Sequence, residues 1–217
     1  MPDHGQLRDH DHAHSPIENG EGPGYFEVLE IAIRELLIEK GLISADDHRR
    51  QIEILDSRTP ALGARVVARA WVDPDFKRRL LSNGSSAVEE LGIGMYDDTK
   101  LIVIENTDTV HNLIVCTLCS CYPRPVLGLP PDWYKSKQYR ARAVREPRAV
   151  LAEFGTIVPA EKEVRVHDST ANMRYLILPQ RPAGTEHLGE EELAALVTRD
   201  AMIGVTIVKA PNQTIDS

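Results

Sequence analysis

All three cysteines of the 217-residue chain, Cys116, Cys119 and Cys121, lie in the six-residue segment CTLCSC. Disulfides between cysteines this close in sequence would close rings too short to restrict the unfolded chain, and buried structural thiols would not gather in one place. A thioredoxin-like redox pair is also disfavoured, because the prolines of the next segment, YPRP at 122–125, block the helix that would lower a thiol pKa. The cluster therefore predicts a metal site.

The number and spacing of the sulfurs restrict the choice of metal. A structural zinc ion usually takes four Cys or His ligands in two separated pairs, and the chain has no second cysteine pair, although His111 could complete a tetrahedral site. The single residue between Cys119 and Cys121 favours another arrangement, since it places peptide nitrogens beside the ion, where a strongly Lewis-acidic trivalent metal can bind them. Three sulfurs and two nitrogens would leave one octahedral position open for substrate or water.

The sequence around the cysteines resembles a known family. The run VCTLCSCYPRPVLGLPP, residues 115–131, is similar to the metal-binding loop of the nitrile hydratase alpha subunit. The similarity continues through WYKS at 133–136, YRAR at 139–142, REPR at 145–148, EFG at 153–155, RY at 174–175, RPAGTE at 181–186, VTRD at 197–200 and MIG at 202–204. It covers roughly residues 25–205, and the loop motif is highly specific.

The resemblance implies a ligand set and a cofactor. In this family the sulfurs of Cys116, Cys119 and Cys121 and the backbone nitrogens of Ser120 and Cys121 hold one low-spin cobalt(III) or iron(III). Thr117 favours Co(III) over the alternative Fe(III), because the family tends to carry Thr there with cobalt and Ser with iron. The resemblance also implies that Cys119 is oxidised to a sulfinic acid and Cys121 to a sulfenic acid.

The resemblance further implies partners. Oxidised sulfurs are anionic acceptors that need charged donors around them, and in the family arginines of a beta subunit supply these donors. One or two beta chains are therefore expected, and this chain alone would not be a complete enzyme. An activator or metallochaperone for cobalt insertion is expected too, because loading a trivalent metal and oxidising selected thiols are hard to achieve spontaneously.

The implied reaction is the hydration of a small nitrile to an amide, as in a hydro-lyase. The metal would polarise a nitrile bound through its nitrogen, and water or a sulfur-bound oxygen would then attack the nitrile carbon. The implied catalytic residues are Ser120 and Cys121, with direct attack by the sulfenate oxygen of Cys121 favoured. Asp168 lies where relatives carry an acid and is expected to support the loop, whereas the next acidic position of that segment is Asn172 here.

Arg124 leaves a second substrate open. Most nitrile hydratases carry Trp at this position, which is expected at the mouth of the pocket, and an arginine would favour an anion. The thiocyanate hydrolase gamma subunit resembles this chain here, so thiocyanate is the alternative substrate. Arg124 could instead pair with a carboxylate at the subunit interface, and the motifs GLPP and WYKS favour the nitrile hydratases. A non-catalytic zinc-binding protein is a third hypothesis.

Charge and hydropathy argue against some classes of partner. The formal net charge of −8 makes nucleic acid an unexpected ligand. No signal-peptide pattern begins the chain and no apolar run approaches membrane-spanning length, so no membrane partner is expected. Free thiols acting as ligands favour a cytoplasmic location.

Residues 1–23 are expected to form a disordered tail, because their Asp, Gly and Pro content cannot build a core. Half of the eight histidines of the chain lie there: His4, His10, His12 and His14. Neutral imidazoles suit cobalt and nickel, so the tail could carry a divalent ion towards the metal site. The alternative is a solubilising tail with incidental metal affinity.

Residues 24–95 are expected to form a helical arm. Apolar residues at i, i+3 and i+4 spacing predict a helix over 25–40. Capping residues and prolines predict further helices over 47–57, 61–71 and 74–82. Since these helices carry little core of their own, the arm is expected to pack on a partner subunit, the alternative being its own domain.

Residues 96–217 are expected to form the metal-binding globular domain. Short β-branched runs predict strands at 101–104, 113–115, 163–167 and 174–178, the second of which leads into the cysteine loop. Helices are predicted over 141–154, with an interruption at Pro147, and over 188–198. The arginines of the first of these segments are expected in surface or interface ion pairs: Arg140, Arg142, Arg145 and Arg148. The fold class predicted is α+β, a small β-sheet flanked by helices, as in nitrile hydratase alpha chains.

Overall fold

The structure, a computed structural model, describes residues 24–95 and 99–211. The chain divides into two compact units, residues 1–51 and residues 52–217. The expected histidine-rich tail, residues 1–23, lies outside the described residues.

The first unit holds the helix α1, Tyr25–Glu39, and the beginning of α2, Ala45–Asp56. Gly41 follows α1 with a φ of 66°, a conformation that favours glycine, and so ends the helix where the sequence predicted. Ser44 caps α2, because its Oγ accepts a hydrogen bond from the backbone N of Asp47 at 2.9 Å. Neither helix contains a buried residue. The apolar face of α1 is therefore open within the described chain.

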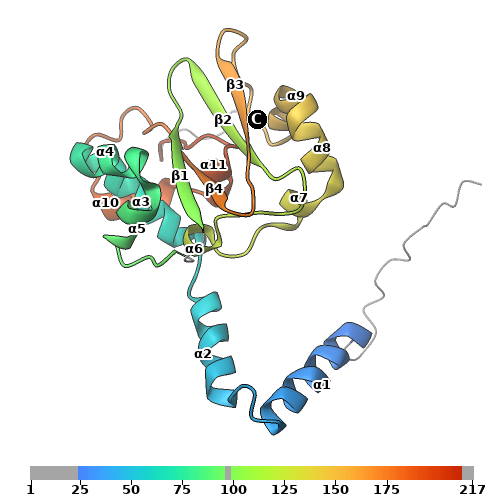
Figure 1. The fold of residues 1–217 in the computed structure, drawn as a ribbon. Helices are drawn as coiled ribbons and strands as arrows, with labels where there is room; N and C mark the ends of the chain where they lie inside the picture. Colours follow the sequence, from blue (N-terminus) through green and yellow to red (C-terminus); the bar gives the residue numbers. More distant parts are fainter. Residues whose placement is uncertain (1–23, 96–98, 212–217) are drawn as a thin grey trace, which may run out of the picture. The chain divides into compact units, whose positions relative to one another are not determined.

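Four strands form the centre of the second unit (Figure 1). The strand β1, Lys100–Glu105, pairs in parallel with β4, Met173–Leu178. The strand β2, Val110–Val115, pairs in parallel with β3, Glu163–Asp168. The register of the second pair places Val115 opposite Asp168, so the last residues of both strands meet at one edge. Parallel pairing requires a long crossover, and here the crossover contains the cysteine loop.

Helices cover this centre from two sides (Figure 1). The helices α3, Pro60–Val72, α4, Pro74–Ser82, and α5, Gly84–Glu89, lie on the β1 side, where α10, Glu190–Leu196, packs on α3. The helices α8, Lys137–Arg145, and α9, Pro147–Glu153, contact β2 and β3. Three short helices complete the unit: α6, Arg124–Leu127, α7, Asp132–Lys135, and α11, Arg199–Ile203.

The boundary of the helical arm differs from the expected one. The sequence placed residues 24–95 in the arm, whereas α3, α4 and α5 belong to the second unit and supply buried residues to its core. Val66 and Val67 of α3, Phe76 of α4 and Val88 of α5 are all buried there. The reason is that these helices each carry an apolar face of the usual width, which needs a partner surface, and β1 and α10 provide one.

The predicted fold class is confirmed, since helices and small sheets are combined as expected for an α+β protein. The Asp73 cap of α4 also forms, with its carboxylate accepting hydrogen bonds from the backbone nitrogens of Asp75 and Phe76. The sequence did not predict α5, α6, α7 or α11, which span only four to six residues each. No helix in the described part of the chain is long and apolar enough to cross a membrane.

Candidate metal centre

The three cysteines follow directly from the end of β2. Val115 and Cys116 are buried, Cys119 is exposed and Cys121 is half-buried. The three Sγ atoms lie within 4.8 Å of one another, and they form the one group of three or more potential metal ligands among the described residues. The edge of a buried strand thus gives the loop a rigid starting point, and the loop turns its sulfurs towards a common centre.

The spacing of the sulfurs allows a test of which metal geometry fits. The Sγ atoms of Cys116 and Cys119 lie 3.5 Å apart, and those of Cys119 and Cys121 lie 3.3 Å apart. With metal–sulfur bonds of about 2.3 Å, sulfurs at right angles about the ion would be about 3.3 Å apart, and sulfurs at the tetrahedral angle about 3.8 Å apart. These two distances are closer to the spacing of neighbouring octahedral positions than to that of a tetrahedral zinc site.

The electrostatics of the thiols differ along the loop. Hydrogen bonds from the thiols of Cys121 and Cys116, together with the backbone N–H groups of Ser120 and Cys121, lower the pKa of Cys119. Burial, and the neighbouring sulfur of Cys119, raise the pKa of Cys121 to about 12. Positive charge on Arg174 opposes this rise. The peptide N–H groups of Ser120 and Cys121 therefore act on the thiol of Cys119, in the loop where the sequence predicted backbone nitrogen ligands.

One carboxylate holds the start of the loop. Asp168, the last residue of β3, accepts hydrogen bonds from the backbone N of Thr117 at 2.9 Å and from its Oγ1 at 2.5 Å. Asp168 occupies this position because the strand register sets it opposite Val115, two residues before Thr117. The structure thus brings together two of the residues that the sequence singled out. Asn172, the departure from the family pattern, is exposed, and its backbone carbonyl oxygen accepts a hydrogen bond from the backbone N of Lys100.

Two side chains that the sequence reasoning did not assign to the site hold the rest of the loop. The hydroxyl of Tyr134 donates to the carbonyl oxygen of Cys121 at 2.8 Å. The Nη1 of Arg140 donates to the carbonyl oxygen of Cys119 at 2.8 Å. These residues lie 13 and 21 positions from their acceptors, so no local spacing signal could have connected them with the cysteines.

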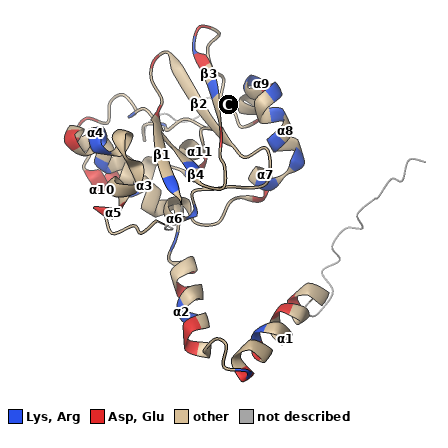
Figure 2. Cartoon of the chain, in the orientation of Figure 1, with Lys and Arg blue, Asp and Glu red and all other residues tan. Residues whose placement is uncertain are grey.

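The arginines of α8 and α9 take different roles, although Figure 2 shows basic residues along both helices. Arg142 forms ion pairs with Glu146 and Glu153, as expected. Within the described chain, Arg140 and Arg148 donate to backbone carbonyl oxygens, and an interface ion pair stays a prediction for both. A guanidinium group has five donors in a fixed fork, which suits it to binding several carbonyl groups of a loop.

An aromatic cluster of Tyr122, Trp133, Tyr134, Tyr139 and Phe154 packs next to the cysteine loop. The rings of Tyr122 and Tyr134 meet edge to face with centroids 5.1 Å apart, and Trp133 contacts Tyr139 and Phe154 in the same way. Tyr139 also donates its hydroxyl to the carbonyl oxygen of Ile114 in β2 at 2.6 Å. Such pairs add directional stabilisation to their buried area. The strand end and the loop are therefore fixed to the same aromatic layer.

Arg124 begins α6, three residues after Cys121, and is exposed. It forms no ion pair within residues 24–95 and 99–211. Its charge is therefore available, three positions after the last cysteine, either for an anionic ligand or for a carboxylate of another chain.

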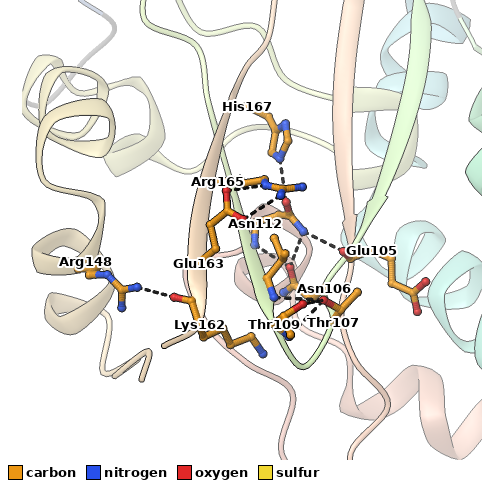
Figure 3. Close-up of polar contacts among 11 residues, drawn as sticks. Glu105, Asn106, Thr107, Thr109, Asn112, Arg148, Lys162, Glu163, Arg165 and His167 are labelled. Carbon is orange, nitrogen blue, oxygen red and sulfur yellow. Dashed lines mark hydrogen bonds and ion pairs between the residues drawn. The ribbon is translucent and has the colours of Figure 1, made fainter. Parts of the chain in front are cut away.

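His111 does not join the cysteines. It is buried in β2, and its Nε2 lies 2.7 Å from the carbonyl oxygen of Gly204. The neighbouring Asn112 links this strand to β3, since its Oδ1 lies 2.9 Å from the Nε2 of His167 (Figure 3). A tetrahedral zinc site would require a fourth ligand. Among the described residues, no His, Asp or Glu joins the three cysteines in the group of potential metal ligands.

Comparison with known proteins places this arrangement in context. A family model described as "Nitrile hydratase, alpha chain" matches residues 24–206. The chain is 52% identical to the low-molecular weight cobalt-containing nitrile hydratase subunit alpha of Rhodococcus rhodochrous, over 93% of this chain and 99% of that one. It is 45% identical to the thiocyanate hydrolase subunit gamma of Thiobacillus thioparus, over 88% and 83%. A solved structure of recombinant thiocyanate hydrolase with partially modified cobalt centres superposes with a TM-score of 0.81 at 43% identity, covering 90% of this chain and 98% of that one.

Proposed function

Since the chain belongs to the nitrile hydratase alpha-chain family, we propose that it is the metal-binding subunit of a cobalt nitrile hydratase, which converts nitriles to amides together with a beta subunit. The observation that carries the proposal is the convergence of the sulfurs of Cys116, Cys119 and Cys121 within 4.8 Å. The cobalt-containing relative from Rhodococcus rhodochrous supports cobalt as the metal.

The ligands proposed are the three cysteine sulfurs and the backbone nitrogens of Ser120 and Cys121, holding one Co(III) with Fe(III) as the alternative. Cobalt bound there would act as a Lewis acid towards the nitrile. Cys119 is proposed to carry a sulfinic acid and Cys121 a sulfenic acid. The oxygen on Cys121 is the proposed nucleophile towards the nitrile carbon; water would then attack the sulfur, so that the old S–O bond breaks, the amide leaves and the sulfenic acid is restored. Ser120 separates the two cysteines proposed to be oxidised.

The remaining residues hold this arrangement in place. Asp168 fixes Thr117 through two hydrogen bonds, and the hydroxyl of Tyr134 and the guanidinium of Arg140 fix the carbonyl groups of Cys121 and Cys119. Tyr134 and Arg140 bind backbone carbonyl oxygens, and Asp168 binds Thr117, which is not a proposed ligand. The three supports therefore leave the sulfurs and the two peptide nitrogens free for the metal. Catalytic groups need such support, because small misplacements of reacting atoms are costly.

The proposed partners follow from the exposure of the loop. Cys119 is exposed in this chain, and oxidised sulfur groups need charged donors around them. Among the described residues, Arg174 acts on Cys121 through its charge, whereas the side-chain partners of the Cys119 sulfur are the other two cysteine sulfurs. A beta subunit is proposed to supply charged donors and to close the pocket around a small nitrile. An activator or metallochaperone is proposed to insert the cobalt, and the cytoplasm is the proposed location.

The test is co-expression of the chain with the beta subunit encoded beside it, in medium containing cobalt. Amide formation from a small nitrile, one cobalt per chain, and a visible absorption band from sulfur-to-metal charge transfer are expected. Mass spectrometry should show two additional oxygens on Cys119 and one on Cys121. Colourless protein with zinc and unmodified cysteines would overturn the proposal and favour a non-catalytic zinc-binding protein.

Thiocyanate hydrolysis, with this chain as the gamma subunit, is the second candidate. The exposed Arg124, which forms no ion pair among the described residues and follows Cys121 by three positions, favours it, because a guanidinium at the pocket would attract an anion. The two candidates differ in what Arg124→Met does to the purified complex. If thiocyanate is the substrate, the KM for thiocyanate should rise strongly, whereas hydration of a neutral nitrile should keep its KM if Arg124 is an interface residue.

A further inference from the structure

A cavity of about 220 Å³ lies in the second unit, away from the cysteine loop. Its lining includes Asn106, which directly follows β1, and His111, near the start of β2. It includes no residue of the segment 116–121. The five residues from His111 to Cys116 span about 17 Å of extended strand. The cavity is therefore separate from the proposed metal centre.

Asn106 places an unused hydrogen-bond donor in the wall of this cavity. Its side chain is 5% exposed, and its Oδ1 accepts from the backbone N of Asn112 at 2.7 Å and from the Nδ2 of Asn112 at 3.0 Å (Figure 3). The backbone N–H can only donate, so the atom facing it must be the oxygen of Asn106. The Nδ2 of Asn106 then has no acceptor among residues 24–95 and 99–211. A side-chain amide nitrogen in a cavity wall that has no protein acceptor is available to donate to a ligand that accepts hydrogen bonds.

Two cations line the same cavity without a carboxylate partner in the described chain. The Nζ of Lys162 donates to the Oε1 of Gln180 at 2.9 Å. The guanidinium of Arg181 donates to neutral oxygens, which belong to Thr185 and Trp71. Neither cation forms an ion pair, and the lining contains no Asp or Glu. The nearest carboxylate in this network is that of Asp108, which accepts from the Nε2 of Gln180 at 2.8 Å.

A third cation strengthens the positive field. Arg148 donates to the carbonyl oxygens of Val158, Pro159 and Lys162, and so fixes the loop that forms one wall of the cavity. Burial lowers the pKa of His111, and the positive charges of Lys162 and Arg148 lower it further. In a chain of net charge −8, uncompensated positive charge around a cavity marks a place where an anion is stabilised.

The rest of the wall is apolar. Ile157 and Ile207 line the cavity and are 79% and 55% exposed, and Pro159, Pro179 and Pro182 lie beside them. An occupant that satisfies both parts of the wall has an anionic head that accepts hydrogen bonds and a short apolar tail. The donor set is small, with one unpartnered amide nitrogen and one ammonium that is bound only to a neutral amide, so it suits a carboxylate better than the three oxygens and double charge of a phosphate.

We infer that this cavity is a binding site for a short-chain aliphatic carboxylate, with its head between the Nδ2 of Asn106 and the Nζ of Lys162. The volume supports a small ligand, since about 220 Å³ corresponds to roughly seven water molecules at their share of liquid volume. Lys162 would exchange its bond to the neutral amide of Gln180 for a charge-assisted bond to the ligand, which is the stronger of the two.

The experiment is calorimetric titration of the full-length chain, alone and with its beta subunit, using pentanoate. Asn106→Asp keeps the oxygen that Asn112 needs and turns the free donor into a negative charge, so it should weaken pentanoate binding by about tenfold or more. Lys162→Met keeps the aliphatic stem and should weaken binding by a similar factor. Lys137→Met removes the charge of an exposed lysine elsewhere and should leave binding unchanged. Pentan-1-ol and inorganic phosphate should bind at least tenfold more weakly than pentanoate.

Three results would overturn the inference. Pentanoate binding that is absent, or that is unaffected by both Asn106→Asp and Lys162→Met, would show that the cavity does not hold the carboxylate. Equal binding of pentan-1-ol would show an apolar site without a head group. If pentanoate binds the chain alone but not the complex, the cavity is filled by a side chain of the beta subunit and is not a ligand site. Thermal denaturation of both variants distinguishes lost binding from lost folding.

Discussion

Thr117 and Asp168 are joined by two hydrogen bonds, of 2.9 Å to the backbone N and 2.5 Å to the Oγ1 of Thr117, although 51 positions separate them in sequence. The pair connects the first residue after Cys116 with the last residue of β3. Because β2 is buried up to Val115 and Thr117 is exposed, this pair holds the loop close to the point where it leaves the buried strand.

The first prediction concerns this pair. Thr117→Val removes the hydroxyl donor and leaves one oxygen of Asp168 without its partner, so the free energy of unfolding should fall by about 1 kcal/mol. Thr117→Ser keeps both donors and is the matched control. Urea denaturation measures the stability, and total metal content after purification, cobalt plus iron, measures the effect on the loop. Equal total metal content and equal stability in the two variants would contradict a positioning role.

A second prediction compares two tyrosines that donate to backbone carbonyl groups. Tyr134→Phe removes the hydrogen bond to Cys121 in the loop, and Tyr139→Phe removes the hydrogen bond to Ile114 in β2. Both should destabilise the fold by about 1–2 kcal/mol, because a buried acceptor loses its donor. Only Tyr134→Phe should increase the rate at which cobalt is lost to a chelator, measured by decay of the visible band. The same rate for both variants would show that the loop does not depend on Tyr134.

Gly204 gives a third prediction. Its φ is 93°, and a Cβ at this position would overlap the carbonyl oxygen of Asn112, a backbone atom that cannot move aside easily. Gly204→Ala should therefore cost about 3 kcal/mol or more. Gly155 has a φ of 76° with open space around it, so Gly155→Ala should cost only the left-handed strain of about 1–2 kcal/mol. Melting temperatures of the two variants test this, and equal shifts would be inconsistent with the close approach.

The fourth prediction concerns pH. Burial lowers the pKa of His111 in the folded chain below its ordinary value of about 6.5. The unfolded chain then binds more protons below about pH 6.5, so the contribution of neutral His111 to stability is complete above that pH and is lost as the pH falls. The free energy of unfolding should decline less steeply between pH 7 and pH 5 in His111→Gln than in the wild type. His187→Gln, at an exposed position, controls for removing an imidazole, and parallel curves for wild type and His111→Gln would refute the assignment.

Much of the secondary structure was predictable because it depends on local signals. The prolines that begin α3 and α4, the Asp73 cap of α4 and the β-branched runs of the four strands lie inside or directly beside the elements that they specify. The parallel pairing was not predictable, since neither strand of a pair carries information about the register of the other. The loop supports from Tyr134 and Arg140 were missed for the same reason, because they depend on where α7 and α8 dock.

The cysteines themselves were predictable from sequence because their clustering is a local feature. The boundary of the arm was not, because an amphipathic helix has the same pattern whether it packs on its own domain or on another chain. For α3 the partner surface is α10, which follows more than a hundred residues later, and nothing in residues 60–72 distinguishes that outcome.

The parallel pairing of β2 and β3 has a kinetic consequence. The cysteine loop follows β2, and Asp168, which supports the loop, is the last residue of β3. The loop therefore cannot take its final shape until the crossover between the two strands has folded and closed. Contacts of such large sequence separation form late, because closing the chain between them costs entropy before any contact compensates for it. The sulfurs would therefore converge only after most of the domain has formed, and a metal offered earlier would meet three separate thiols rather than a binding site.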